Sequence, residues 1–234
     1  MGKKIAGKIN QPPAQADFDA IALAAFCRQV QGVFYRLHGS DPAGNAWPPL
    51  HFSKRGNSRF DSRGGVGALC IGQTLAGAMM EVFDDHWGPV GSLGRSVTEA
   101  QLEQTWVTRV SLPATRLFDA TGPNLSKIGV DAQLLTGKYT TTRKWAARLM
   151  GHRDQIDGIL YRSRHDLDRI NVALFQRGAF FPAALSPALQ PFAPDPWTRS
   201  AGYGAVLVHS VAVRLRDHPE LTGALVELRV ARLP

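Results

Sequence analysis

The chain has little cysteine and no long hydrophobic run. Cys27 and Cys70 are the only cysteines among 234 residues. Two are too few for a disulfide framework, and both lie in apolar stretches, so we expect buried free thiols in a reducing compartment. No stretch approaches the roughly 18 to 20 apolar residues that span a bilayer, and Asp17 and Asp19 interrupt the place where a signal peptide needs its apolar core. The sequence therefore predicts a cytoplasmic protein without a membrane partner.

Several motifs for common cofactors and nucleophiles are also missing. Residues 67–74 match the spacing of a phosphate-binding loop, but Gln73 stands where that motif needs its lysine. His165, Asp166 and Asp168 come nearest to a metal cluster, yet no second histidine or cysteine pair has the spacing of metal ligands. A GxSxG elbow is absent as well. We expect neither a bound metal nor a resident cofactor.

Negative charge is the scarcer sign, since 27 Lys and Arg residues oppose 19 Asp and Glu residues, which gives a net charge of +8. Such an excess fits either nucleic acid or a small phosphorylated ligand. Its one dense cluster is Arg162 and Arg164 around Ser163, and alternation along a strand would turn both arginines away from the face of Ser163. A nucleic-acid-binding protein stays open as an alternative. However, the sequence shows no basic and aromatic platform or recognition helix, so direct nucleic-acid binding is not expected.

Hydrophobic periodicity predicts strands and helices without regular alternation. The expected helices are residues 17–31 (ended by Gly32), 74–86 and a helical region at 124–150. The expected strands are residues 33–37, 66–71, two strands within 105–119 divided by Pro113, 157–161, 172–175, 203–215 and 224–230. Residues 39–65 form a long loop, of a length that is usually functional. The fold class is therefore α+β, with residues 1–32 as an N-terminal tail and helix, 33–190 as the main domain and 191–234 as a C-terminal extension of β-strands packed on it.

Polar residues that could form one site are spread along this framework. They are Arg36 beside Tyr35 on the first strand, Arg59 in the long loop, Glu81 on the 74–86 helix, Ser163 after an apolar strand and Asn171 at the start of the next. Taken singly, each has an ordinary structural explanation, such as an ion pair, a solvated loop residue or a surface glutamate. They can form one functional site only if the fold brings them close together.

Glu81 is placed by the periodicity of its helix. The apolar stripe of this helix is formed by Leu75, Met79, Val82, Phe83 and His86. At 100° per residue, Glu81 lies on the opposite side and shares it with Gly77. A glycine one turn away leaves room for a ligand to approach the helix.

Five short motifs in a fixed order resemble the RES domain family, which is named for its Arg, Glu and Ser. They are Phe34–Leu37, Ser58–Asp61, Ala78–Val82, Asp157–Ser163 and Asn171–Phe175, and together they span roughly residues 33–180. Carried over position by position, the resemblance makes Arg36 and Arg59 the NAD-contacting arginines, Glu81 the catalytic glutamate and Ser163 the catalytic serine. Tyr35 and Asn171 belong to the same motifs and are expected to bind NAD.

The resemblance implies a fold like that of the ADP-ribosyltransferase toxins, with a mixed, split β-sheet core and flanking helices. It also implies an NAD phosphorylase or glycohydrolase that cleaves the nicotinamide–ribose bond, as a toxin paired with an Xre-type helix-turn-helix antitoxin. NAD is then the substrate and inorganic phosphate a potential co-substrate. Protein ADP-ribosylation, a catalytically weak NAD-binding member and a homodimer stay open. The chain departs from the family pattern at Cys70, where the family commonly has a tyrosine.

Overall fold

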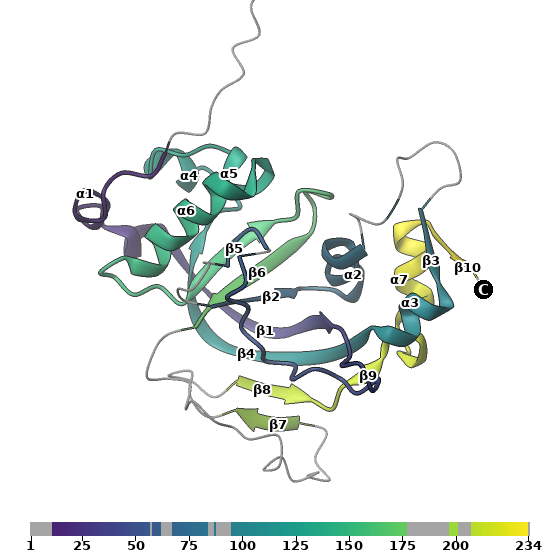
Figure 1. The fold of residues 1–234 in the computed structure, drawn as a ribbon. Helices are drawn as coiled ribbons and strands as arrows, with labels where there is room; N and C mark the ends of the chain where they lie inside the picture. Colours follow the sequence, from purple (N-terminus) through teal and green to yellow (C-terminus); the bar gives the residue numbers. More distant parts are fainter. Residues whose placement is uncertain are drawn as a thin grey trace, which may run out of the picture.

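The computed structural model describes residues 11–56, 58–61, 67–83, 87, 95–176, 197–200 and 207–233. Its strands are β1 (Cys27–His38), β2 (Ala68–Gly72), β3 (Arg95–Thr98), β4 (Trp106–Asp119), β5 (Gly158–Arg162), β6 (Ile170–Phe175), β7 (Trp197–Ser200), β8 (Leu207–Ser210), β9 (Val213–Arg214) and β10 (Val230–Leu233). Its α-helices are α1 (Gln15–Asp19), α2 (Leu75–Phe83), α3 (Glu99–Gln104), α4 (Asn124–Lys127), α5 (Gln133–Thr136), α6 (Tyr139–Gly151) and α7 (Leu221–Leu228). Figure 1 shows α1, α4, α5 and α6 gathered on one side of the central strands and α2, α3 and α7 on the other. The mixed α+β class predicted from the sequence is confirmed.

Strands β1 and β4 form the longest pairing and organise the rest of the sheet. They run antiparallel from Cys27↔Phe118 to His38↔Trp106. The strand order β1-β2-β6-β5-β4 returns to β1 through this pairing, so these five strands close into a ring, while β8 and β9 also pair with β4. The β4–β5 pairing is parallel.

One row of backbone partners crosses four strands of this ring. Tyr35 on β1 is opposite Gly72 on β2, Gly72 is opposite Asn171 on β6, and Asn171 is opposite Tyr161 on β5. Residues that are far apart in the sequence therefore lie side by side at one end of the sheet. Two of them, Tyr35 and Asn171, were singled out from the sequence.

Apolar side chains pack into three clusters around the sheet. The first joins α1 and α6 to the strands and includes Phe18 and Trp145, whose ring centroids are 5.9 Å apart. The second joins α2, α7 and β1. The third is formed by residues of β1, β2, β4, β5 and β6 together with Phe52 of the long loop. In the part of the chain that the structure describes, no helix is long and apolar enough to cross a membrane.

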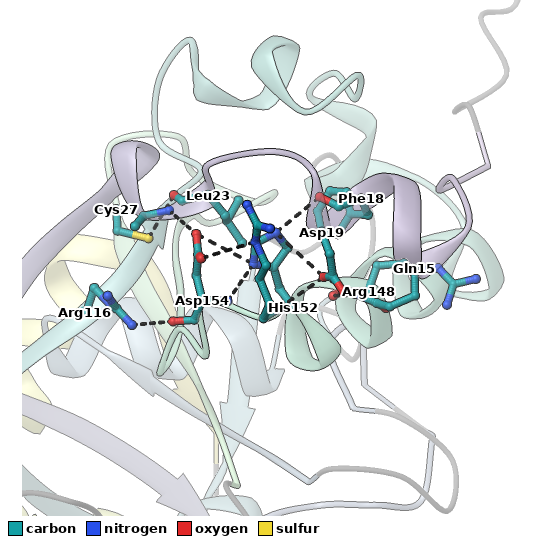
Figure 2. Close-up of polar contacts among 11 residues, drawn as sticks. Gln15, Phe18, Asp19, Leu23, Cys27, Arg116, Arg148, His152 and Asp154 are labelled. Atoms are coloured by element: carbon teal, nitrogen blue, oxygen red, sulfur yellow. Dashed lines mark hydrogen bonds and ion pairs between the residues drawn. The ribbon is translucent and has the colours of Figure 1, made fainter.

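The N-terminal segment is tied to the end of α6 by buried polar contacts around His152 (Figure 2). The His152 ring is 1% exposed, and its Nδ1 accepts the backbone N–H of Asp154 at 3.0 Å. Its Nε2 is therefore left to donate to the carbonyl of Phe18, 3.2 Å away. The Asp154 carboxylate in turn accepts the N–H of Ala24 at 2.8 Å. These bonds hold α1 and the 3-10 turn Leu23–Phe26 against the main body.

The predicted helix over residues 17–31 is wrong for most of its length. Helix α1 ends at Asp19, and β1 already begins at Cys27. The cause is tertiary, because residues from Cys27 onward exchange ladder hydrogen bonds with β4 and this pairing overrides local helical periodicity. Gly32, expected to stop the helix, lies at φ +135° where the register shifts between Val30 and Gly32, so it serves a β-bulge.

Two further expectations are corrected. Within the expected range of 105–119, residues 106–119 form one strand, β4, because Pro113 falls at the same irregularity and has no partner opposite it in β1. Residues 224–230, expected as a strand, belong mostly to helix α7, and β10 starts at Val230. Helix α7 buries Leu221, Ala224, Leu225 and Leu228 against α2, and this apolar face favours the helix. Of the strand expected over residues 203–215, β8 and β9 are present, and residues 203–206 lie outside the described residues.

Candidate functional site

A pocket of about 240 Å³ opens at the end of the sheet that carries the four-strand row. Its walls come from β1, β2, β6, α2, the loop before β2, β5 with the loop after it, and the first residue of α6. Among the described residues, the arginines and carboxylates that line it are Arg36, Arg59, Arg164 and Glu81. Three cations against one carboxylate make the pocket positive, which favours an anionic ligand.

The Glu81 carboxylate is held by two buried donors. Ser163 Oγ donates to Glu81 Oε1 at 2.6 Å, and Asn171 Nδ2 donates to the same oxygen at 3.0 Å. Glu81 is exposed on α2, whereas Ser163 and Asn171 are 0% and 1% exposed. An O–H···O⁻ bond of this length is of the strong, charge-assisted kind. The fold thus brings together three residues that were predicted from sequence motifs.

Two glycines set the position of α2. A Cβ on Gly72 would lie 2.7 Å from the backbone nitrogen of Ala78, so only glycine permits this approach of helix to strand. Gly77 was expected to leave room for a ligand, but it is buried and does not line the pocket. A Cβ there would lie 3.2 Å from Thr74 Oγ1 and 3.6 Å from Asn171 Oδ1, so side chains of the protein itself occupy this space.

The buried face of α2 is wider than the predicted stripe. Val82, expected in that stripe, is 41% exposed and lines the pocket beside Glu81. Met80, outside the stripe, is buried. The helix packs against both the sheet and α7, so more than one of its sides is covered. His86 lies outside the described residues.

Arg36 is drawn into the sheet from β1. Its Nη1 donates to the carbonyl of Cys70 at 3.0 Å, whereas its buried Nε has no hydrogen-bond partner among the described residues. Burial lowers the pKa of this guanidinium from its usual value, although an arginine in a protein keeps its proton. A desolvated cation with an unused donor gains from a bound anion.

Arg59 is buried, although a loop arginine is ordinarily solvated. It is 8% exposed, its Nη1 donates to the carbonyl of Gly137 at 2.9 Å, and its guanidinium carbon lies 4.9 Å from the ring centroid of Tyr139. Its Nη2 has no hydrogen-bond partner in the described part of the chain. Burial lowers the pKa of this group as well. Arg36 and Arg59 are therefore both desolvated cations of the same pocket.

The loop that carries Arg59 is organised by Asp61, which is fully buried. Asp61 Oδ2 accepts hydrogen bonds from Ser53 Oγ at 2.7 Å and from the N–H of Gly56 at 3.1 Å. Its Oδ1 accepts the N–H of Ser58 at 3.0 Å. The sequence analysis did not single out Asp61 as functional. In a loop without regular structure, this carboxylate supplies the acceptors that hold the backbone around Arg59.

Tyr35, predicted to bind NAD, lines the pocket. Its hydroxyl donates to the carboxylate of Glu220, and each of the two carboxylate oxygens lies 2.8 Å away.

Cys70 also lines the pocket as a partly buried free thiol. The buried Tyr161 hydroxyl lies beside this thiol, and burial raises the pKa of Cys70 to about 11. Tyr161 therefore places a phenol beside the position where the family commonly has its tyrosine.

Arg164 lines the pocket, contrary to the expectation from strand alternation. Strand β5 ends at Arg162, so alternation no longer governs the residues after it. Arg162 itself does point away, and its Nε donates to the carbonyl of Thr121 at 3.1 Å. Tyr139, at the start of α6, is another pocket residue that the sequence analysis missed. No local signal distinguishes it from other surface tyrosines.

The polar residues that were considered as a metal cluster are engaged otherwise. His165 Nε2 accepts a hydrogen bond from Arg164 Nε at 2.7 Å, and Asp166 pairs with Arg169 at 2.9 Å. Across the described residues, no group of three His, Cys, Asp or Glu side chains lies close enough to hold a metal ion.

Comparison with known proteins agrees with the motif order. The model of the RES domain matches residues 33–197. The search of curated proteins found no match. Among solved structures, the chain is similar to a chain of the crystal structure of the M. tuberculosis MbcT–MbcA toxin–antitoxin complex, with 14% identity, a TM-score of 0.50 and coverage of 69% of this chain and 81% of that chain. At this identity the likeness is one of fold. Because the RES domain match spans well over half of its residues, the chain belongs to the RES domain family.

Proposed function

We propose that this protein is an NAD-consuming enzyme that breaks the bond between nicotinamide and ribose. The observation that carries the proposal is the Glu81 carboxylate, fixed by Ser163 at 2.6 Å and Asn171 at 3.0 Å at the edge of a pocket lined by three arginines. This arrangement suits a substrate that is anionic at one part and becomes cationic at another during the reaction.

The chemistry requires little besides positioning and charge. When the C1′–N bond breaks, its electron pair goes to the pyridinium nitrogen, which becomes neutral, and the ribose carbon acquires oxocarbenium character. A carboxylate held beside that carbon stabilises the developing positive charge. An oxygen of water or phosphate then bonds to C1′, and in the reaction with water one proton is released to the solvent. Glu81 is the only carboxylate among the described pocket-lining residues, so we assign this role to it.

The arginines act on the other part of the substrate. Arg36 and Arg59 each keep a buried N–H donor without a partner among the described residues, and a guanidinium fork matches phosphate oxygens well. We assign both to the diphosphate of NAD. Asn171 lines the same pocket and donates to Glu81, so we assign it to orienting the carboxylate beside the ribose.

The volume of the pocket limits how much of the substrate it can enclose. Ligand pockets commonly measure roughly 300–1,000 Å³, so a cavity of about 240 Å³ suits the nicotinamide–ribose half of the dinucleotide with its adenosine outside. We further propose an ADP-ribosyltransferase-like arrangement of the core, and a toxin that an antitoxin holds in check. The toxin–antitoxin complex in which a similar fold occurs supports that second proposal.

The reaction is tested by incubating the purified protein with NAD, with and without inorganic phosphate, and separating the products by chromatography. Release of nicotinamide without added metal is the expected result. Faster loss of NAD in phosphate identifies a phosphorylase, and equal loss identifies a hydrolase. Folded protein that binds NAD but releases no nicotinamide under either condition would instead be a catalytically inactive binding member.

A further inference from the structure

The residues around Tyr139 form a group that the five family motifs do not explain. The guanidinium carbons of Arg59, Arg143 and Arg164 lie 4.9, 5.2 and 5.8 Å from the centroid of the Tyr139 ring. Cations within about 6 Å of an aromatic ring are attracted by its quadrupole. One aromatic ring therefore attracts three positive charges, although these charges repel one another.

The three arginines differ in their contacts and in whether they line the pocket. Arg143 does not line the pocket, and its Nε donates to the carbonyl of Ser58 at 2.9 Å, so it supports the Arg59 loop. Arg59 and Arg164 both line the pocket. Arg59 is 8% exposed and keeps Nη2 without a hydrogen-bond partner among the described residues. A buried, unsatisfied cationic donor is costly unless a ligand completes it.

The group is continuous with the proposed catalytic carboxylate. Ser163 Oγ, which donates to Glu81, lies 3.3 Å from the backbone N–H of His165 and accepts from it. Arg164 lies between Ser163 and His165 in the chain, and its Nε donates to His165 Nε2 at 2.7 Å. The loop after β5 thus fixes a catalytic contact and a guanidinium group together.

We propose that Arg164 and Tyr139 complete, with Arg59, a phosphate-binding subsite beside Glu81. Two guanidinium groups on one wall recognise the tetrahedral oxygens of a phosphate group. Tyr139 acts as a positioning residue, since its ring holds both guanidinium groups at the pocket wall. The phosphate belongs either to the diphosphate of a dinucleotide or to free inorganic phosphate. The inference rests on the proposed function only in naming these two sources of the phosphate group.

Binding is measured by calorimetry with ADP-ribose, with inorganic phosphate and with nicotinamide, which carries no phosphate. Arg164→Gln should weaken ADP-ribose or phosphate binding roughly 10- to 150-fold, as expected for a charge-assisted hydrogen bond, and leave nicotinamide binding unchanged. Arg153→Gln is the matched control, because its side chain is 62% exposed away from the pocket. Loss confined to ADP-ribose identifies the dinucleotide diphosphate as the ligand, and loss with inorganic phosphate as well identifies a phosphate site open to the free ion.

The role of Tyr139 is tested by comparing a variant that keeps the aromatic ring with one that removes it. Tyr139→Phe keeps the aromatic face and should bind the phosphate ligands as the unmodified protein does, whereas Tyr139→Leu should bind them roughly 2- to 30-fold more weakly. Equal binding by the Phe and Leu variants would show that the ring does not position the arginines. If Arg164→Gln binds both phosphate ligands like Arg153→Gln, or the unmodified protein binds neither, the subsite is overturned.

Failure of the subsite can be told apart from failure of the proposed reaction. The same variants are assayed for nicotinamide release. Weakened ADP-ribose binding in a protein that never releases nicotinamide would keep the subsite and remove the enzyme. Normal release with unchanged KM for NAD in Arg164→Gln would keep the enzyme and remove Arg164 from the site.

Discussion

Ser163 Oγ donates a 2.6 Å hydrogen bond to Glu81 Oε1 across 82 residues of sequence. The serine is fully buried at the end of β5, whereas the glutamate is exposed on α2. A fixed donor thus restrains a carboxylate that would otherwise sample several rotamers, and Asn171 adds a second restraint on the same oxygen. Preorganisation of this kind is what electrostatic catalysis requires, because the charge is already in place when the transition state forms.

Glu81→Gln should abolish most turnover while the fold survives. The amide keeps a carbonyl oxygen that can accept the bonds from Ser163 and Asn171, so the melting temperature should change little. The lost negative charge is worth about 3 to 4 kcal/mol in the transition state, hence about two to three orders of magnitude in kcat. NAD affinity should change much less. Nicotinamide release is the measurement, with Glu103→Gln at an exposed position outside the pocket as the control. Near-normal release by Glu81→Gln would remove the glutamate from the mechanism.

Ser163→Ala should lower kcat more than it alters KM. The substitution removes the donor to Glu81 Oε1 and leaves Asn171 as its remaining described side-chain donor. A hydrogen bond to a charged group contributes about 1.5 to 3 kcal/mol, which corresponds to a roughly 10- to 150-fold loss. Ser126→Ala, at an exposed serine that donates to the carbonyl of Pro123, is the matched control. Steady-state kinetics decide the matter, and an unchanged kcat would mean that the serine does not position the carboxylate.

Asp61→Ala should damage both stability and NAD binding. It strands the Ser53 hydroxyl and the backbone N–H groups of Gly56 and Ser58, which the carboxylate accepts in a fully buried place. We expect a loss of about 3 kcal/mol in the free energy of unfolding. Urea denaturation measures the first effect and calorimetry with ADP-ribose the second. Asp131→Asn, on the surface, serves as the control. A loop that tolerates Asp61→Ala with full affinity would contradict its role in holding Arg59.

Both cysteines should be slow to alkylate at pH 8. Burial raises the pKa of Cys27 and of Cys70 to about 11, whereas an ordinary thiol has a pKa of roughly 8.5 to 9. The reactive thiolate is therefore about a hundredfold scarcer than in an unfolded chain at this pH. Because the pKa of each thiol is higher in the folded state, the unfolded chain loses these protons first. The thiols therefore contribute their full share to the free energy of unfolding below about pH 9, and this share is lost as the pH rises towards 11. Iodoacetamide labelling followed by mass spectrometry, with the urea-unfolded chain as reference, measures the rates. Rapid labelling of Cys70 in folded protein at pH 8 would refute the shift.

Local signals in the sequence were sufficient for the elements nearest the site. Strands at residues 33–37, 66–71, 157–161 and 172–175 and the helix at 74–86 were predicted from hydrophobic periodicity, and the structure has an element that overlaps each. The motif order also pointed to Arg36, Arg59, Glu81, Ser163 and Asn171. The structure brings Glu81, Ser163 and Asn171 into direct contact and puts both arginines on the pocket wall.

The remaining features depend on partners that are distant in sequence. Cys27 to Gln31 became strand because β4 pairs with it, and residues 221–228 became helix against α2. The gathering of arginines on Tyr139 and the entry of Arg164 into the pocket each require segments that are far apart in the sequence.

The sequence by itself determined which residue types carry the chemistry and the short elements on which they lie. Hydrophobic periodicity and turn preferences act within one helix or strand and are legible in a single segment. Only the tertiary structure decided how Glu81 is held, which arginines lose their water and which loop residues reach the pocket. These properties arise from hydrogen bonds and burial between segments as far apart as Glu81 and Asn171, and no local pattern records them.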